Sequence, residues 1–253
     1  MPVNPALVDW TGRRVWIVGA SSGIGAALAR ALIDRGARVA VSARSAERLA
    51  RVGAEVAVAM DVRDAHATGQ ALGAVLDAFG GLDLAVYCAG TYAPMRATTF
   101  ELDIALEHDE VNYRGALRWL DAVLPVLLEQ RAGHLSLVSS AAGWRGLPQA
   151  LAYGPTKAAL IHLAEALRID LHDHGIGVSV VNPGFVDTPL TARNDFRMPA
   201  LMQPEHAALA ILRGWQRGRF DIHFPRRFTL WLKLLRWLPD RVYFQLTQRI
   251  TGL

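Results

Sequence analysis

The sequence predicts an α/β fold: a single doubly wound domain with a parallel sheet of about seven strands and helices on both faces. Two observations predict it. Short apolar runs rich in β-branched residues alternate along the chain with longer segments of helical periodicity. A glycine-rich turn directly follows the first apolar run. Such alternation gives parallel strands joined by right-handed crossovers, so we expect a ligand site beyond the carboxyl ends of the strands.

Each element follows from its local pattern. The β-branched apolar runs predict strands over residues 15–18, 39–41, 56–60, 84–87, 135–138, 178–181 and 221–224. Apolar residues at helical spacing predict helices over residues 24–35, 64–79, 101–129, 152–172 and 204–217. Gly36 should stop the first helix, and Pro204 suits the first turn of the last. Pro125 should kink the third helix or break it near its end.

The composition indicates a well-packed protein in a reducing compartment. Of 253 residues, 52% are hydrophobic and 20% are charged, which allows a large core and argues against disorder. The single cysteine, Cys88, excludes an internal disulfide and a Cys-based zinc cluster. Residues 1–10 show no secretory signal, and no apolar run is long enough to span a membrane. We therefore expect a cytoplasmic protein. His162, His172 and His174 lack companion ligands, so we expect no metal site.

The positive charge is concentrated in the last residues. Residues 226–253 hold six basic residues against the single acid Asp240, a net charge of +5, which leaves −1 for residues 1–225. The basic balance is therefore no argument for nucleic-acid binding. This tail is either a helical extension packed on the body or a subunit contact, or a basic amphipathic segment on an anionic membrane. Packing is favoured because Pro239 interrupts the segment and the apolar residues form no clean stripe.

The turn after the first strand has the composition of a phosphate-binding loop. Its sequence is Gly19-Ala20-Ser21-Ser22-Gly23-Ile24-Gly25, with GxxxGxG spacing. Glycine lets the backbone approach a pyrophosphate, and the helix N-terminus offers free N–H groups and partial positive charge. An ordinary tight turn is the alternative. The position after the first strand of an alternating pattern favours a dinucleotide.

The end of the second strand favours NADP(H) over NAD(H). An NAD site normally has an acid about 20 residues past the glycine turn, whereas this strand ends Ser42-Ala43-Arg44-Ser45. A guanidinium pairs with a 2′-phosphate, which a carboxylate would repel. We therefore expect Ser42 and Arg44 to bind that phosphate, with a solvated loop arginine as the alternative. Asp61, closing the third strand, is placed to bind the adenine amino group, or else caps the next helix.

Further motifs follow the later strands. They are Cys88-Ala89-Gly90, Val111-Asn112, Ser139-Ser140, Tyr153-x-x-x-Lys157 and Asn182-Pro183-Gly184. With the glycine turn, they make residues 12–225 resemble the single-domain branch of the short-chain dehydrogenase/reductase family. The Tyr-x-x-x-Lys spacing alone is common, but its position 13 residues after Ser140 is far more specific. Val18 and Cys88 depart from the family's usual threonine and asparagine.

The resemblance implies a Rossmann-fold oxidoreductase that transfers a hydride between NADP(H) and a carbonyl or alcohol. Tyr153 would be the general acid/base, and Ser140 would hold the substrate oxygen. Lys157 would bind the nicotinamide ribose and, with the oxidised nicotinamide, lower the pKa of Tyr153. Asn112 would anchor a water that connects Lys157 with solvent. The chain has 25 arginines and two lysines, so a lysine at position 157 independently supports a need for an ammonium.

The resemblance also implies a set of cofactor-binding residues. Val186 and Thr188 would grip the nicotinamide carboxamide. The expected set is Gly19, Ser21, Ser22, Gly23, Ile24, Gly25, Ser42, Arg44, Asp61, Val62, Cys88, Ala89, Gly90, Tyr153, Lys157, Pro183, Gly184, Val186 and Thr188. By their position, residues 189–203 look like a substrate lid. Residues 92–95, 144–149 and 189–202 predict a mostly apolar substrate pocket.

Several alternatives stay open at this point. Residues 1–225 are expected to form the catalytic NADP(H)-binding domain, with residues 226–253 as an extension of it. A non-catalytic NADP(H)-binding sensor or scaffold, and a membrane-docked lipid carbonyl reductase, are alternatives to a reductase free in the cytoplasm. A sugar-nucleotide epimerase would need more chain after residue 204. The resemblance implies a homodimer or homotetramer formed through the two long helices.

Overall fold

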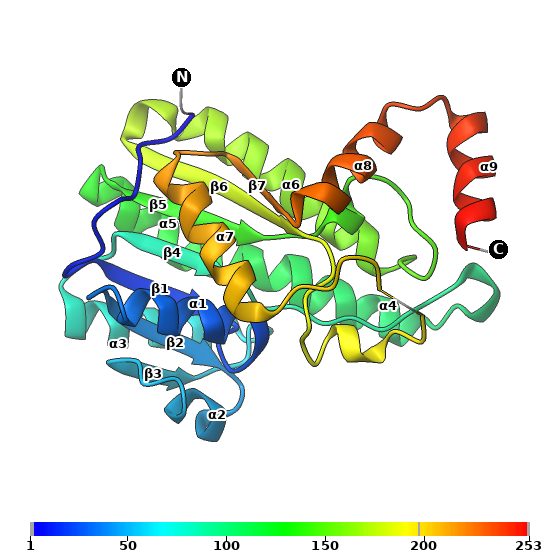
Figure 1. Cartoon of the computed structure of the whole chain (residues 1–253). Helices are drawn as coiled ribbons and strands as arrows, with labels where there is room; N and C mark the ends of the chain where they lie inside the picture. Colours follow the sequence, from blue (N-terminus) through cyan, green and yellow to red (C-terminus); the bar gives the residue numbers. More distant parts are fainter. Residues whose placement is uncertain (1–2, 197, 252–253) are drawn as a thin grey trace.

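The computed structural model describes residues 3–196 and 198–251. Seven strands form one sheet: β1 (Arg14–Val18), β2 (Arg38–Ala43), β3 (Val56–Ala59), β4 (Leu84–Tyr87), β5 (Gly133–Val138), β6 (Ile176–Pro183) and β7 (Asp221–Phe224). Their order is β3-β2-β1-β4-β5-β6-β7, and every neighbouring pair is parallel (Figure 1). The predicted doubly wound α/β fold is confirmed. The strand order reverses between β1 and β4, and this reversal opens a crevice at the carboxyl ends.

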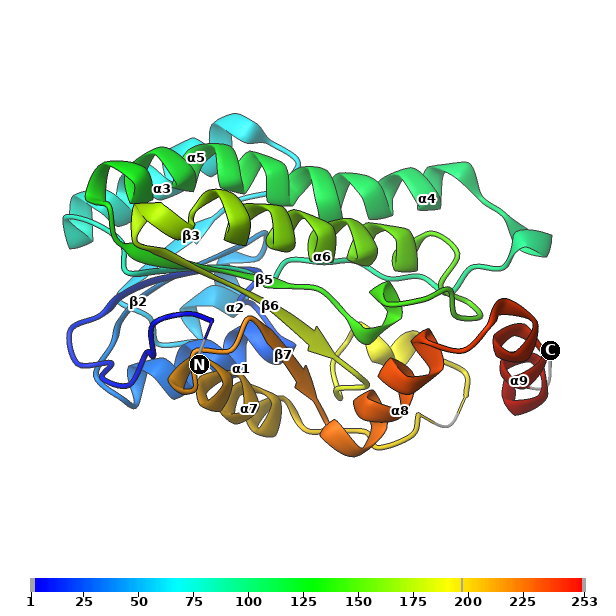
Figure 2. The ribbon, with the colours of Figure 1, turned by 90° about the horizontal axis from the view of Figure 1, so that it is seen from above.

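Helices cover both faces of the sheet (Figure 2). α1 (Gly23–Ile33) and α7 (Pro204–Gln216) pack on one face, and α3 (Ala65–Phe79), α5 (Gly115–Gln130) and α6 (Tyr153–Asp170) pack on the other. Leu28 and Trp215 are fully buried on the first face, and Trp119 and Leu160 on the second. Burying one such side chain contributes roughly 1.5–3 kcal/mol. The two cores fix the strand ends from which the site is built.

The predicted helix over residues 101–129 is interrupted, although not at Pro125. It comprises α4 (Leu102–His108), a π-helical segment (Asp109–Arg114) and α5, which continues past Pro125 to Gln130. The π-helical segment carries the buried Asn112, and the Tyr87 hydroxyl donates to the Val111 carbonyl over 2.5 Å. The chain therefore does not break at Pro125, and the alternative of a kink there stays a prediction. The interruption lies where buried side chains bond the backbone instead, a common setting for π-helical turns.

Sequence periodicity also missed a short helix after β2. α2 (Ala46–Ala50) has only five residues, so it holds too few turns to show a helical period. Its first turn is capped by the Ser45 hydroxyl, which accepts from the Arg48 N–H. This cap turns the chain so that Arg44 and Arg48 lie on one side of the crevice.

Two helices follow β7. α8 (Arg226–Arg236) packs beside that strand, and α9 (Asp240–Thr251) lies farther out, at one end of the molecule (Figure 2). α8 buries Thr229, and α9 buries Tyr243, whose hydroxyl donates to the Gly146 carbonyl. One side of each helix therefore packs on the body of the protein, which is the first of the alternatives given for residues 226–253. Within residues 3–196 and 198–251, no helix combines the length and the apolar character needed to cross a bilayer.

Candidate active site

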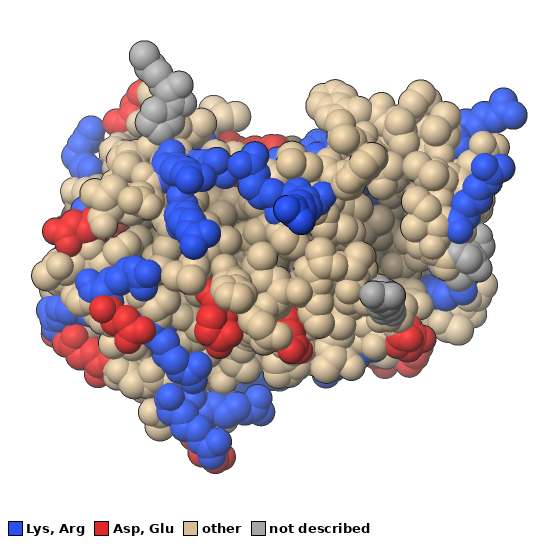
Figure 3. Space-filling view, viewed as in Figure 1, with Lys and Arg blue, Asp and Glu red and all other residues tan. Residues whose placement is uncertain are grey.

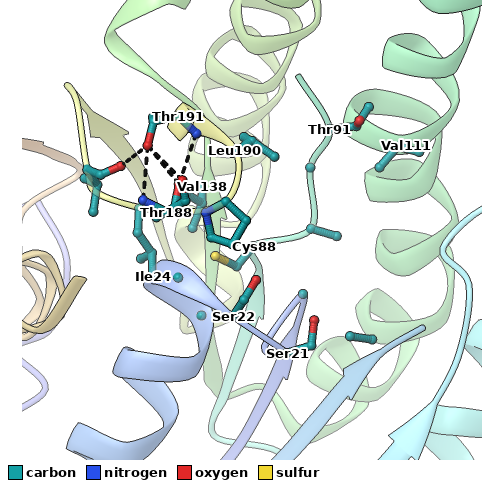
Figure 4. A pocket seen from close by; sticks show the side chains of 18 of the residues that line it. Ser21, Ser22, Ile24, Cys88, Thr91, Val111, Val138, Thr188, Leu190 and Thr191 are labelled. Carbon is teal, nitrogen blue, oxygen red and sulfur yellow. Dashed lines mark hydrogen bonds between the residues drawn. The ribbon is translucent and has the colours of Figure 1, made fainter. Parts of the chain in front are cut away.

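A cavity of about 440 Å³ lies at the carboxyl ends of the central strands. It is lined by the loops that follow β1, β2, β3, β4, β5 and β6, and by the start of α6. Figure 4 shows Ser21 and Ser22 on one side of it, with Thr188 and Thr191 on the loop after β6. The location agrees with the expectation for a doubly wound sheet.

The glycine turn is shaped by close backbone contacts. Gly19 has φ +89°, and a Cβ there would lie 2.3 Å from the backbone nitrogen of Ala89. Gly23 has φ +54°, which side chains rarely adopt. A Cβ on Gly25 would lie 2.4 Å from the Gly19 carbonyl oxygen. A side chain at Gly19 or Gly25 would displace backbone, and one at Gly23 would strain a positive φ and press on the Thr188 side chain, so the turn depends on glycine at all three.

The N-terminus of α1 opens into the cavity, and no side chain caps it from the N-cap position. Ser22, at the N-cap position, makes no side-chain capping bond, and the first turn contains no acidic residue. The first N–H groups of a helix have no partner inside the helix, and they carry partial positive charge. This terminus, bordered by the glycine turn, fits the pyrophosphate of a dinucleotide.

Two arginines line the cavity beyond β2. Arg44 was expected from the sequence; Arg48, one helical turn later on α2, was missed. The sequence shows that Arg44 and Arg48 are four residues apart, but nothing in it indicates that the residues between them form a helical turn. The carboxylate of Asp61 lines the same region and is bound by the Arg63 guanidinium, which holds the pKa of Asp61 below its ordinary value.

Ser42 does not lie where the sequence prediction placed it. Its side chain is fully buried and accepts a hydrogen bond from Trp16 Nε1 over 3.0 Å, and it does not line the cavity. The expected contact between Ser42 and a 2′-phosphate is therefore wrong. The other interpretation of Asp61, as a helix cap, is wrong as well, because Asp64 caps α3 by accepting from the N–H groups of His66 and Ala67.

Tyr153 and Lys157 begin α6 and meet inside the cavity. The Lys157 side chain is buried and that of Tyr153 is partly buried, with Lys157 Nζ 5.5 Å from the centre of the Tyr153 ring. Lys157 Nζ donates to the Val138 carbonyl over 3.0 Å. Burial lowers the pKa of Lys157 to about 8, because an ammonium away from water is disfavoured. Because Tyr153 and Lys157 are one helical turn apart, the phenol lies close to an ammonium whose pKa is lowered.

The pKa of Tyr153 moves opposite to the expected direction. Burial raises it to about 12, and Ser140 only partly offsets this by favouring the ionised phenol. The expected lowering of this pKa by Lys157 is not produced by the chain alone, because loss of water around the phenol outweighs the hydrogen bond with Ser140. The phenol therefore keeps its proton over the neutral pH range.

Asn112 supports the site from behind its wall. Its side chain does not line the cavity; it accepts from the Thr91 N–H over 2.7 Å and donates to the Thr156 hydroxyl over 3.0 Å. A Cβ placed on Gly90 would lie 3.3 Å from Asn112 Oδ1 and 3.5 Å from Lys157 Nζ, so the amide is close to the ammonium. The expected water between Asn112, Lys157 and solvent stays a prediction.

The side of the cavity away from the glycine turn is closed by aromatic contacts and a loop. The Tyr92 ring lies edge-on to Tyr153 with centroids 5.1 Å apart. Its hydroxyl donates to Asn194 Oδ1, and the Arg193 guanidinium donates to the Tyr92 carbonyl. These bonds tie the loop after β6 across the catalytic residues. Within the expected lid, residue 197 lies outside the described residues. Trp144, expected in the substrate pocket, instead packs against His223.

The cavity lining contains most of the residues predicted from the sequence. All expected catalytic and cofactor-binding residues except Ser42 and Asn112 line it. The lining residues outside the predicted catalytic and cofactor-binding set are Ala43, Ser45, Arg48, Met60, Thr91, Val111, Val138, Ser139, Pro189, Leu190, Thr191 and Arg193. Of these, Val111 and Ser139 belong to predicted motifs, and the last four belong to the expected lid. Cys88 lines it as a thiol whose pKa burial raises to about 11, so it stays protonated near neutral pH. Among the described residues, no three or more His, Cys, Asp or Glu side chains group as a metal site would require.

Comparison with known proteins points in the same direction. The sequence profile of short chain dehydrogenases matches residues 13–197. An uncharacterized oxidoreductase from Myxococcus xanthus is 34% identical over 252 residues, which covers 96% of this chain and 100% of the relative. An uncharacterized oxidoreductase from Staphylococcus epidermidis is 32% identical over 201 residues, covering 78% of this chain and 87% of the relative.

Solved structures share the whole architecture. A short chain dehydrogenase from Burkholderia cenocepacia, in complex with NADP, superposes with a TM-score of 0.83 at 27% identity, covering 94% of this chain and 97% of that one. An alcohol dehydrogenase from the archaeon Thermococcus sibiricus, complexed with 5-hydroxy-NADP, gives a TM-score of 0.76 at 28% identity. That comparison covers 84% of this chain and 96% of the archaeal chain.

Proposed function

Since the chain belongs to the short-chain dehydrogenase family of oxidoreductases, we propose that it reduces an apolar aldehyde or ketone with NADPH. The observation that carries the proposal is the cavity, in which Ser140, Tyr153 and Lys157 share one space with the glycine turn. A phenol that keeps its proton is the form that reduction needs, because the carbonyl oxygen must gain a proton as it gains charge.

The preference for NADP(H) rests on charge at the end of β2. Arg44 and Arg48 line this part of the cavity, and the strand ends without the acid that would hold a free ribose. A 2′-phosphate would pair with these guanidiniums. The relatives solved with NADP and 5-hydroxy-NADP support the same choice.

Each remaining contact to the cofactor follows from position in the cavity. The N-terminus of α1 and the glycine turn would hold the pyrophosphate, and Asp61 would accept from the adenine amino group. Lys157 would bind the nicotinamide ribose. Val186 and Thr188, on the loop after β6, would hold the carboxamide.

The chain's own residues would supply the proton and the charge stabilisation. The bound nicotinamide supplies the hydride. Tyr153 Oη would give its proton to the carbonyl oxygen, and Ser140 Oγ would donate to the same oxygen as its charge grows. Lys157 would then favour the phenolate until the proton is replaced, through the relay that we propose for Asn112 and a bound water. The loop over Tyr92 would limit access of bulk water.

The proposal is tested by following NADPH and NADH oxidation with a panel of apolar aldehydes and ketones. Tyr153→Phe should lower turnover by roughly 10²–10⁴-fold, the usual share of general acid catalysis, while NADPH still binds. Tyr113→Phe is the matched control, because Tyr113 does not line the cavity. Turnover that survives in Tyr153→Phe would refute the assigned role. Tight NADPH binding without turnover on a broad panel would favour the sensor alternative.

We further propose that the protein assembles as a homodimer or homotetramer through the long helices of the second face. Members of the family typically assemble as oligomers. Residues 1–225 would act as the catalytic unit, with residues 226–253 as an extension of it.

A further inference from the structure

One face of α8 is apolar and exposed. Trp231, Leu234 and Trp237 expose 68%, 61% and 85% of their surface, and Leu230 is exposed beside them. Their spacing places them on one side of the helix, whereas the buried Thr229 lies on the other. The described part of the chain therefore leaves this face uncovered. Exposed contiguous apolar surface of this kind marks an interaction site.

Basic side chains frame this face. Arg226 and Arg227 lie one turn before Leu230 and Trp231, on the same side of α8. The arginines of the two helices that are exposed are Arg226, Arg227, Arg236, Arg241 and Arg249. In Figure 3 the surface over α8 and α9 is mostly uncharged, with basic side chains along its outer edge. Arg226 and Arg227 therefore give one end of the apolar face a cationic border, and the other exposed arginines add to the positive charge of the tail.

The acidic residues near the tail are already engaged. Lys233 pairs with Asp221, and the Arg145 guanidinium pairs with Asp240. Among the described residues, no carboxylate lies within ion-pair distance of the five exposed arginines. The rest of the chain carries a net charge of −1, so the tail forms a distinct positive pole. Such a pole orients the molecule toward an anionic partner.

We propose that the exposed face of α8 docks on the surface of an anionic lipid bilayer, as an interfacial contact and not as a spanning one. Leu230, Trp231, Leu234 and Trp237 would enter the boundary between headgroups and acyl chains, where tryptophan is favoured. The arginines would contact lipid phosphates. A second copy of this chain fits less well, because a two-fold contact through this face would oppose two positive poles.

Docking in this way would bring the bilayer to the substrate side of the cavity. The tail contacts two loops that border the catalytic residues: Arg145 and Gly146 bond to it after β5, and Phe185 packs on Phe228 after β6. A carbonyl compound dissolved in the bilayer would then lie near these loops. This consequence rests on the proposed function, whereas the docking itself does not.

The test is sedimentation of the full chain with vesicles of phosphatidylcholine alone, or with phosphatidylglycerol added, without cofactor or substrate. We expect binding only to the anionic vesicles and weaker binding as salt increases. The double variant Trp231→Ser/Trp237→Ser should lower the partition coefficient by roughly tenfold or more. Arg226→Gln/Arg227→Gln should lower it by a similar factor, since each arginine near such a surface strengthens binding roughly fivefold.

Two control variants test whether the loss of binding is specific to the tail. Val8→Ser alters an exposed apolar residue outside the tail, and Arg30→Gln/Arg35→Gln removes two exposed arginines on or just after α1. Both should bind anionic vesicles like the unaltered chain, and NADPH binding by every variant checks that it is folded. No sedimentation with anionic vesicles, or equal binding by tail variants and controls, would overturn the proposal. So would concentration-dependent dimers, seen by sedimentation velocity, that the tryptophan variant abolishes. Because no turnover is measured, failure of docking leaves the proposed reaction untouched.

Discussion

At the nucleotide end of the cavity, the wall is closely packed backbone, whereas at the catalytic end it consists of loops held by distant side chains. Gly25 packs against the backbone of Gly19 and Ala20, and Gly19 packs against the backbone of Ala89 after β4. By contrast, the loop after β5 is held by Arg145, which donates to the carbonyls of Leu235 and Leu238. The first arrangement allows little variation; the second can change without disturbing the cofactor end. We infer that cofactor binding and substrate choice can be altered separately.

The largest expected effect is at the nucleotide end. Gly25→Val would place a side chain where a Cβ already lies 2.4 Å from the Gly19 carbonyl oxygen, so the turn must shift away from the pyrophosphate position. We expect NADPH affinity to fall by roughly a hundredfold or more, measured by fluorescence titration. Gly69→Ala is the matched control, because nothing lies within 4 Å of the added carbon. That control should bind normally and gain up to about 1 kcal/mol of stability from helix propensity. Normal affinity in Gly25→Val would contradict a backbone-limited wall.

A smaller effect is expected from the cationic part of the same end. Arg44→Ala should weaken NADPH binding by roughly 10- to 100-fold, because a charge-assisted hydrogen bond contributes about 1.5–3 kcal/mol. NADH affinity should stay the same, since NADH lacks the 2′-phosphate. Arg51→Ala serves as control: Arg51 is exposed at the end of α2 and pairs with Glu47. Equal losses for the two cofactors would show that Arg44 shapes the loop and does not select the phosphate.

At the nucleotide end, the sequence predicts the glycine turn better than it predicts the side chains at the end of β2, for a physical reason. The glycine turn depends on neighbouring residues, so its position between a strand and a helix was sufficient. The error at Ser42 arises because β2 is buried on both faces, and no alternation of polar and apolar residues shows which way a side chain points. The orientation of Ser42 is decided by Trp16 on the neighbouring strand.

At the catalytic end, the identity of Tyr153 and Lys157 was available from their spacing, but their electrostatics were not. Burial decides both pKa values, and burial depends on the packing of Tyr92 and the loop after β6. Likewise, the sequence showed apolar and basic residues mixed in the tail without indicating which face meets the body. The face of the tail that meets the body is decided by contacts such as the hydrogen bond between Gly146 and Tyr243, 97 residues later in the chain.

The smallest expected effect comes from a change that destabilises the catalytic end of the cavity and leaves the nucleotide end intact. Arg145 donates to the carbonyls of Leu235, Arg236 and Leu238 and to Asp240, and its guanidinium lies over the Tyr243 ring at 3.8 Å. Arg145→Ala should remove about 2 kcal/mol of local stability, since only part of this set is shielded from water. Amide exchange in residues 226–251 should then accelerate by roughly thirtyfold.

The same variant should raise KM for the carbonyl substrate while the NADPH affinity stays unchanged, because Arg145 contacts no part of the nucleotide end. Arg35→Ala, just after α1 and outside the cavity lining, controls for the loss of an exposed arginine. A loss of NADPH affinity in Arg145→Ala as large as the rise in KM would mean that the tail supports the whole cavity. The two ends would then be one cooperative unit, and the substrate could not be changed without cost to the cofactor site.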